Sequence, residues 1–337
     1  MKRNMKQWLN EYMNSPVKQA MPILSFPGVQ LIGHTVDELV RSGELQAQCM
    51  KAVADRFDTG VSFSLMDLSV EAEAFGSAVH YSEDDVPTIH EALIHDEDEA
   101  EALVVPEVGA GRTGECVEGI RKACELITDR PVIAGIIGPY SLAGRLLDMT
   151  EIMILCYEEP EMVETVLEKV TEFQIAYAKA FKEAGANGIC MAEPAAGLLS
   201  PSLMDEFSTP YVKKIREAVE DENFVVIYHN CGNNVELLIN NISKVDAAAY
   251  SFGNVIDIEN TLKALPEDNM IIGNIDPAGT LRNGTPEVIR KEVLELLERC
   301  SKYPNFVLSS GCDIPPQTPI DNLQAFFDAA AEFYGKY

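Results

Sequence analysis

The chain has no long hydrophobic run and few positive charges. Nothing in its 337 residues approaches the roughly 18 consecutive apolar residues of a membrane-spanning helix. Lysine and arginine total 26 against 54 for aspartate and glutamate, which gives a net charge of −28. Such a chain repels nucleic acid and anionic membrane surfaces overall. We therefore expect neither a nucleic-acid partner nor a membrane partner.

Disulfide and leader signals are also missing. The eight cysteines are scattered and no C-x-x-C pair occurs, so we expect most of them to be small buried residues in a reducing compartment. The first ten residues carry Lys2, Arg3 and Lys6 without the apolar core of a signal peptide. Low-complexity tracts and sustained heptads are absent as well. The sequence predicts a soluble, globular, cytoplasmic protein.

Apolar segments of strand length alternate with helical segments along most of the chain. Strands are predicted at 21–26, 60–65, 131–137, 187–192, 224–229, 246–250, 270–275 and 306–310. Strands that alternate with helices predict a parallel sheet, and eight of them predict a closed (β/α)8 TIM barrel. We expect a single domain over 1–337, with an N-terminal helix within 1–20. The segment of about 67–130 is too long for one crossover, so we expect an insertion after the second strand, over the barrel mouth.

Polar residues follow the predicted strands, whereas the strands themselves are apolar. In a TIM barrel the active-site groups come from the C-terminal ends of the strands. The candidate catalytic residues at these ends are Asp67, Glu71 and Glu193, and the candidate cofactor-binding residues are Gly138, Asn274 and Asp276. Glu193 could act as a base or fill an open metal position. A purely structural carboxylate is an equal alternative.

Two of the predicted strands end in side chains that can bind a metal. His229 and Cys231 are two residues apart, so in extended backbone they point to the same side. Cys312 follows the last predicted strand, and in a parallel barrel the two strand ends meet at one mouth. Two thiolates and an imidazole suit Zn²⁺ and leave a fourth position open for chemistry. The alternative is a core histidine with buried cysteines, but the neighbouring Gly232 and Gly311 leave room for close approach and favour a metal.

The run His229-Asn230-Cys231-Gly232-Asn233, together with Cys312, resembles the H-x-C…C zinc motif of methylcobamide:coenzyme M methyltransferases. These enzymes form a branch of the uroporphyrinogen decarboxylase superfamily. Further segments similar to that superfamily lie at 70–76, 138–144, 192–196 and 273–277. The resemblance implies a (β/α)8 barrel, one Zn²⁺ bound by His229, Cys231 and Cys312, and a methyl-Co(III) corrinoid donor such as methylcobalamin on a partner corrinoid protein. The implied acceptor is a thiol such as coenzyme M, or tetrahydrofolate, and Arg145 is the basic residue that we place near the mouth for a sulfonate.

One departure from the superfamily pattern bears on the reaction. Its decarboxylases carry an arginine-rich motif after the first strand, to neutralise the carboxylates of their tetrapyrrole, but residues 25–33 contain no arginine here. This argues against decarboxylation of a porphyrinogen. A uroporphyrinogen decarboxylase-like lyase remains one alternative. A non-catalytic corrinoid- or tetrapyrrole-binding protein with a structural zinc remains another.

A glycine motif in the predicted insertion has two interpretations. Residues 109–114 match G-x-G-x-x-G, the pattern of dinucleotide-binding loops. That interpretation needs a preceding strand, whereas the segment before the motif is short and broken by Pro106. We therefore predict a flexible loop that leads into a helix at Glu115, rather than a nucleotide site.

Overall fold

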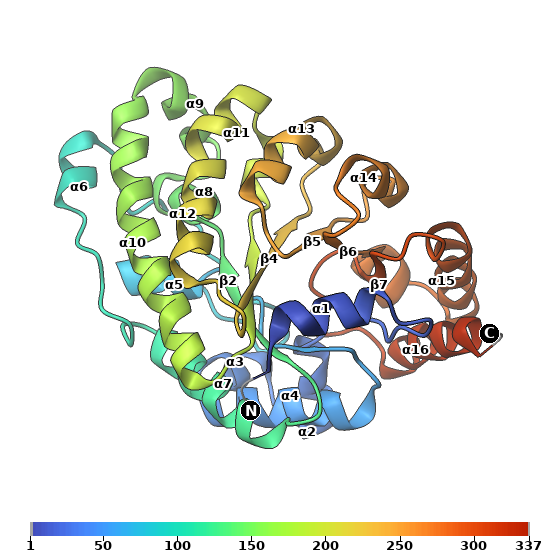
Figure 1. The fold of residues 1–337 in the computed structure, drawn as a ribbon. Helices are drawn as coiled ribbons and strands as arrows, with labels where there is room; N and C mark the ends of the chain where they lie inside the picture. The colour runs from blue at the N-terminus through green and yellow to red at the C-terminus, as the bar shows by residue number, and fades with distance from the viewer. Residues whose placement is uncertain (1–2, 336–337) are drawn as a thin grey trace.

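A parallel β-sheet lies at the centre of the molecule, whose computed structural model describes residues 3–335 (Figure 1). Its seven strands pair in chain order, each parallel to the next. They are β1 Ser62–Phe63, β2 Val132–Ile137, β3 Gly188–Ala192, β4 Val225–Asn230, β5 Ala249–Phe252, β6 Met270–Ile275 and β7 Phe306–Ser310. Because all of the strands are parallel, their C-terminal ends meet at one end of the sheet, as predicted.

Helices surround the sheet and connect its strands (Figure 1). Before β1 come α1 Met5–Met13, η1 Phe26–Gly28, α2 Val29–Ile32, α3 Val36–Val40 and α4 Gly43–Arg56. Between β1 and β3 come α5 Val70–Phe75, α6 Glu97–Ala102, α7 Thr113–Leu126, α8 Pro139–Leu147, α9 Glu151–Glu158 and α10 Pro160–Ala184. The others are η2 Ala195–Leu198, α11 Pro201–Phe207, α12 Thr209–Val219, α13 Val235–Ile242, η3 Ser243–Val245, α14 Ile258–Ala264, η4 Pro277–Arg282, α15 Pro286–Cys300 and α16 Ile320–Tyr334. Among residues 3–335, no helix combines the length and the apolar character needed to cross a membrane.

The prediction of a first strand at 21–26 is wrong, and the described residues form seven strands instead of eight. Residues 20–23 nevertheless lie between β7 and β1. The hydrogen bonds that hold them there join Met21 N–H to Leu308 O at 2.8 Å, Gly60 N–H to Ala20 O at 3.0 Å and Ile23 N–H to Ser310 Oγ at 3.1 Å. One of these acceptors is a side chain, so the segment fills the gap without forming a regular ladder.

Apolar side chains pack against both faces of the sheet. On the inner face, side chains from all seven strands pack with Met5, Leu9 and Met13 of α1. The Met5 N–H donates to Glu222 O at 2.7 Å, just before β4 begins, which places α1 at the N-terminal end of the strands. A larger apolar cluster lies between the sheet and the surrounding helices. Burial on both faces explains why the strands read as continuous apolar runs.

Candidate functional site

Three potential metal ligands lie together at the C-terminal end of the sheet. His229 is in β4, Cys231 follows β4 and Cys312 follows β7. One ligand atom of each residue lies within 4.8 Å of the others, and the two Sγ atoms are 3.8 Å apart. Two sulfurs bound tetrahedrally to one zinc ion, each at ~2.3 Å, would lie about 3.8 Å from one another. The donor types and the sulfur separation therefore fit a zinc ion.

The imidazole of His229 is oriented as in a metal ligand. Its Nδ1 lies 3.0 Å from the hydroxyl of Ser251, which is paired with His229 in the register between β4 and β5. Its Nε2 is buried and has no hydrogen-bond partner. A buried polar atom without a partner costs free energy, whereas metal-bound histidines typically use one nitrogen for the metal and the other for a hydrogen bond. The unpartnered Nε2 is therefore the strongest structural sign of a ligand at this position.

A hydrogen bond links the two thiols, with Cys312 Sγ as donor and Cys231 Sγ as acceptor at 3.8 Å. The hydrogen bond from Cys312 lowers the pKa of the Cys231 thiol. The same bond, together with burial, raises the pKa of Cys312 to about 12, against the opposing effect of His229. Metal ions bind cysteine as the thiolate, so a cation bound here would displace the thiol protons of Cys231 and Cys312.

The turn after β4 is held by the residues on either side of Cys231. The Asn230 side chain donates to Glu193 O at 2.9 Å and accepts from Gly232 N–H at 2.9 Å. A Cβ atom at Gly232 would lie 2.5 Å from the Cα of Gly197, which is too close for any residue with a side chain. The absence of a side chain at Gly232 thus lets the backbone turn tightly and present Cys231 at the mouth.

Glu193 is fully buried and lies at the N-terminus of α8. Its two carboxylate oxygens each accept a hydrogen bond of 2.8 Å, from Tyr140 N–H and Ser141 N–H. Burial raises the pKa of Glu193 to about 7, against the opposing effect of the bonds from Ser141 and Tyr140. A Cβ at Gly138 would lie 2.4 Å from this carboxylate, so the glycine makes room for it. Among residues 3–335, Glu193 is not part of the His229 group.

A buried arginine neutralises Asp67. The Arg112 guanidinium, whose side chain is 7% exposed, forms ion pairs with Asp67 and Glu73. It also donates to the Ser69 hydroxyl at 2.7 Å, and this hydroxyl in turn donates to Asp67 at 2.6 Å. Arg112 belongs to the glycine-rich loop at 109–114, which therefore anchors the segment that follows β1. This role is structural, and the sequence did not reveal it.

Glu71 lies beside this cluster but is separate from its ion pairs. It is 1% exposed, and one carboxyl oxygen accepts a hydrogen bond of 3.0 Å from Ile137 N–H at the end of β2. Burial raises the pKa of Glu71 from 4.5 to about 8, and the bond from Ile137 opposes this only in part. The buried carboxyl therefore carries a proton at neutral pH.

The raised pKa of Glu71 makes stability depend on pH. Between about pH 4.5 and pH 8 the folded state keeps a proton that the unfolded state has lost, so the free energy of unfolding falls as pH rises, by about 1.4 kcal/mol per pH unit. We expect the Glu71→Gln substitution to remove this contribution and leave a flatter profile, measured by urea unfolding at pH 5, 6.5 and 8. The exposed Glu91→Gln variant is the control. Parallel profiles for wild type and Glu71→Gln would contradict the assignment.

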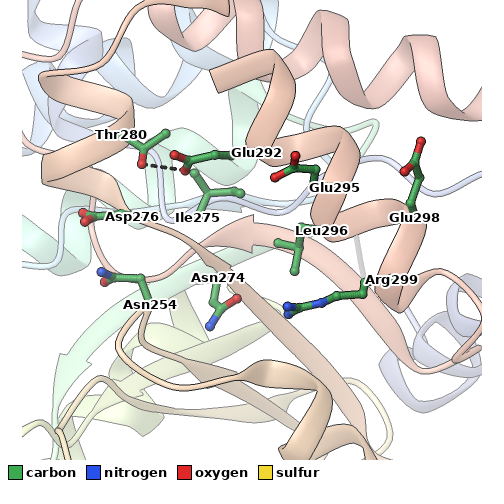
Figure 2. A pocket seen from close by; sticks show the side chains of 10 residues that line it. All are labelled: Asn254, Asn274, Ile275, Asp276, Thr280, Glu292, Glu295, Leu296, Glu298 and Arg299. Atoms are coloured by element: carbon green, nitrogen blue, oxygen red, sulfur yellow. Dashed lines mark hydrogen bonds between the residues drawn. The ribbon is translucent and has the colours of Figure 1, made fainter. Parts of the chain in front are cut away.

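Asn274 and Asp276 line a cavity of about 770 Å³ between the end of β6 and α15 (Figure 2). The Asn274 amide is engaged, since it donates to Gly253 O at 2.9 Å and to Ile256 O at 3.0 Å. Asp276 caps η4 by accepting bonds of 2.9 and 2.8 Å from the next backbone N–H groups. The far wall carries Glu292, Glu295 and Glu298 of α15. The ligand atoms of the His229 group do not line this cavity, so the structure separates the two sets of candidates.

Arg145 lies where the sequence suggested, near the mouth. It lines a cavity of about 380 Å³ together with Arg282 and with Asp313, the residue after Cys312. Arg282 was missed by the sequence analysis, although it follows the end of β6 by only seven residues. A basic residue so soon after a strand end is the signal that could have identified it.

Family membership follows from a match along most of the chain. The model of the uroporphyrinogen decarboxylase (URO-D) family matches residues 14–333. The chain therefore belongs to the uroporphyrinogen decarboxylase family. The family predicted from the H-x-C…C motif and its companion segments is confirmed.

Methyltransferases and a decarboxylase are both among the similar proteins. Methylcobamide:CoM methyltransferase MtbA of Methanosarcina acetivorans is 29% identical over 313 residues, which cover 89% of this chain and 90% of that protein. The solved structure of a methyltransferase from Methanosarcina mazei covers 98% of both chains at 25% identity, with a TM-score of 0.86. A uroporphyrinogen decarboxylase of Anaeromyxobacter sp. is 27% identical over 311 residues, covering 89% of this chain and 88% of that protein.

Proposed function

We propose that the protein is an enzyme that moves a methyl group from a methyl-Co(III) corrinoid to a thiol such as coenzyme M. The observation that carries this proposal is the meeting of His229, whose Nε2 is buried without a hydrogen-bond partner, with Cys231 and Cys312 at the strand ends. The similarity to methylcobamide:CoM methyltransferases and to a solved methyltransferase structure supports the same reaction. Zinc is the metal that we propose for the site, because two thiolates and an imidazole suit it.

The residues of the site suit activation of a thiol. When bound, zinc would lower the pKa of an acceptor thiol, so that the thiolate is available near neutral pH. The acceptor sulfur would bond to the methyl carbon while the cobalt–carbon bond breaks, and the electron pair of the broken bond would stay on cobalt, which changes from Co(III) to Co(I). The chain contributes by holding its ligands in place, with Ser251 orienting His229 and Gly232 shaping the turn at Cys231.

We propose a positioning role, not a catalytic one, for Glu193, Asp67 and Glu71. Glu193 fixes the N-terminus of α8, Asp67 fixes the loop of Arg112, and Glu71 fixes the end of β2. For Asn274 and Asp276 we propose a contact with the corrinoid donor through the cavity that they line. Gly138 would act indirectly, by making room for Glu193.

The proposal extends to the architecture. We propose that the chain is one (β/α)8 barrel domain in which residues 20–23 stand in for the missing strand, since they bridge β7 and β1. The insertion at about 67–130 would cover part of the mouth, because residues 85–89 line the cavity beside Asp313. A corrinoid-carrying partner protein would deliver the donor. A cytoplasmic location suits the eight free cysteines.

The decarboxylase alternative is favoured by one observation, the similarity to the Anaeromyxobacter enzyme. Its tetrapyrrole substrate carries several carboxylates, whereas the cavity at the mouth offers two arginines and is about 380 Å³ in volume. Ligand cavities range over about 300–1,000 Å³, so this one suits a compact molecule. Methyl transfer to a small acceptor therefore accounts better for the site.

The test is methyl transfer from free methylcobalamin to coenzyme M by the zinc-loaded protein. We expect methylated coenzyme M, detected by mass spectrometry, to appear together with the absorbance change of demethylated cobalamin. The Cys312→Ser variant should show neither, whereas Cys124→Ser, outside the metal group, should match wild type. Loss of carboxylate from uroporphyrinogen, with no thiol methylated, would replace the proposal by the decarboxylase alternative.

A further inference from the structure

Cys231 and Cys312 differ from the other cysteines of the chain because they contact each other and are also accessible. Their Sγ atoms are 3.8 Å apart, and both side chains are partly exposed at the C-terminal end of the sheet. Within residues 3–335, no other two cysteines are joined by a hydrogen bond. The other partly exposed pair, Cys116 and Cys124, is separated by eight residues of α7, or about 12 Å along the helix.

The two sulfur atoms can form a bond through movements of the side chains. A sulfur–sulfur bond is about 2.05 Å long, so each Sγ needs to move by about 0.9 Å, which a rotation of about 30° about its Cα–Cβ bond provides. The neighbouring backbone is held meanwhile, since Gly311 N–H donates to Ile275 O at 2.7 Å and Gly232 N–H donates to Asn230 Oδ1 at 2.9 Å. The two cysteines therefore stay opposite one another.

A bond between these sulfurs would exclude a metal ion from the site. Zinc binds cysteine through the negative charge of the thiolate, and the sulfurs of a disulfide no longer carry that charge. Of the three members of the group, only His229 would remain as a donor. One imidazole holds zinc far more weakly than an imidazole with two thiolates, so bond formation and zinc binding are mutually exclusive states of the same residues.

We propose that Cys231 and Cys312 are a site of reversible disulfide formation, at which a peroxide replaces the bound zinc ion by a sulfur–sulfur bond. This inference rests on the zinc site of the proposed function, but it does not require methyl transfer to occur. The switch would suit that function, because the Co(I) product is a strong reductant that peroxides also oxidise. Methyl transfer would then stop under the conditions that destroy its product.

The proposed reaction has two steps. One thiolate sulfur attacks an oxygen atom of hydrogen peroxide, the oxygen–oxygen bond breaks, hydroxide leaves, and a sulfenic acid forms. The second thiolate attacks the sulfenic sulfur, the sulfur–sulfur bond forms, and a second hydroxide leaves. The two sulfurs together lose two electrons, which the peroxide gains, and two protons convert the hydroxides to water. Zinc leaves as Zn²⁺, and a dithiol reductant reverses the change.

The test treats zinc-loaded protein with hydrogen peroxide and follows zinc release with a chromogenic chelator. We expect wild type to release about one zinc per chain and to lose two hydrogen atoms, about 2 Da, by mass spectrometry. Protease digestion should yield a peptide that joins Cys231 to Cys312, and dithiothreitol should restore both the mass and zinc binding. Cys124→Ser should behave as wild type, whereas Cys312→Ser should yield no joined peptide.

These measurements separate the inference from the proposed function. Failure of the proposed function would appear as a protein that methylates no thiol, and the joined peptide of wild type would still support the disulfide. Zinc release accompanied by oxygen atoms added to single sulfurs, without a joined peptide, would overturn the inference. A peptide that joins either cysteine to Cys190, the buried cysteine of β3, would also overturn it.

Discussion

Substitution of Cys312 by alanine is expected to abolish zinc binding. Wild type should carry about one zinc per chain, measured by elemental mass spectrometry on protein purified without added metal. Cys312→Ala and His229→Ala should each carry almost none, because two remaining donors hold the ion far more weakly than three. The Ser251→Ala variant should show an intermediate loss, about 10- to 100-fold in affinity, because Ser251 orients His229.

The control for this experiment is another cysteine of the same chain. Cys124 on α7 lies outside the metal group, so Cys124→Ala should retain the full zinc content. Circular dichroism would establish that each variant is folded. Zinc retained at one per chain in both Cys312→Ala and His229→Ala would show that the metal is held elsewhere, and the proposed zinc mechanism would fail.

The number of protein ligands distinguishes a catalytic zinc site from a structural one. Structural zinc sites are closed by four protein ligands, whereas catalytic sites leave one position for substrate. Within residues 3–335 the group has three members, and the Glu193 carboxylate is engaged by backbone N–H groups of α8. The arrangement therefore favours a reactive metal over a purely structural one.

Arg112→Met is expected to be the most destabilising substitution among the residues discussed here. It removes the partner of Asp67, whose side chain is 3% exposed, and leaves a buried carboxylate without a counter-charge. Removal of one member of a buried ion pair typically costs about 3–5 kcal/mol in the free energy of unfolding. Urea unfolding monitored by circular dichroism would measure this loss.

Two further variants make the Arg112 result interpretable. Arg121→Met removes an arginine of α7, the helix that follows Arg112, whose ion pair is exposed, so it should cost less than about 1 kcal/mol. The double variant Asp67→Asn/Arg112→Met should regain part of the stability, since the buried negative charge is removed together with its partner. If Arg112→Met cost no more than Arg121→Met, the buried cluster would have no special role.

Most strands could be predicted because their residues are buried on both faces, which makes the sequence apolar without interruption. The exception at 21–26 has the same apolar character. Sequence composition reports burial, but it does not report which group accepts each N–H, and at Ile23 the acceptor is the Ser310 hydroxyl instead of a backbone carbonyl. A segment can therefore look like a strand and lie beside strands without joining their ladder.

The candidate metal ligands could be predicted because parallel topology brings strand ends together regardless of their distance along the chain. The orientations of the Glu193 and Asp67 carboxylates could not be predicted from the sequence. Glu193 points toward α8 because Gly138 leaves space there, and Asp67 is held by Arg112 from 45 residues further along. Such contacts depend on how loops return to the sheet, which neither spacing nor periodicity encodes.

The proposed metal ion would bind close to the place where β7 and β1 are joined without a regular ladder. Residues 20–23 are attached there by scattered bonds, whereas β6 and β7 share a five-residue register. Cys312 extends from the strand that borders this weak join, while His229 and Cys231 extend from the middle of the regular ladder. An ion that binds all three would connect β7, the strand that borders this join, to β4 at the centre of the sheet.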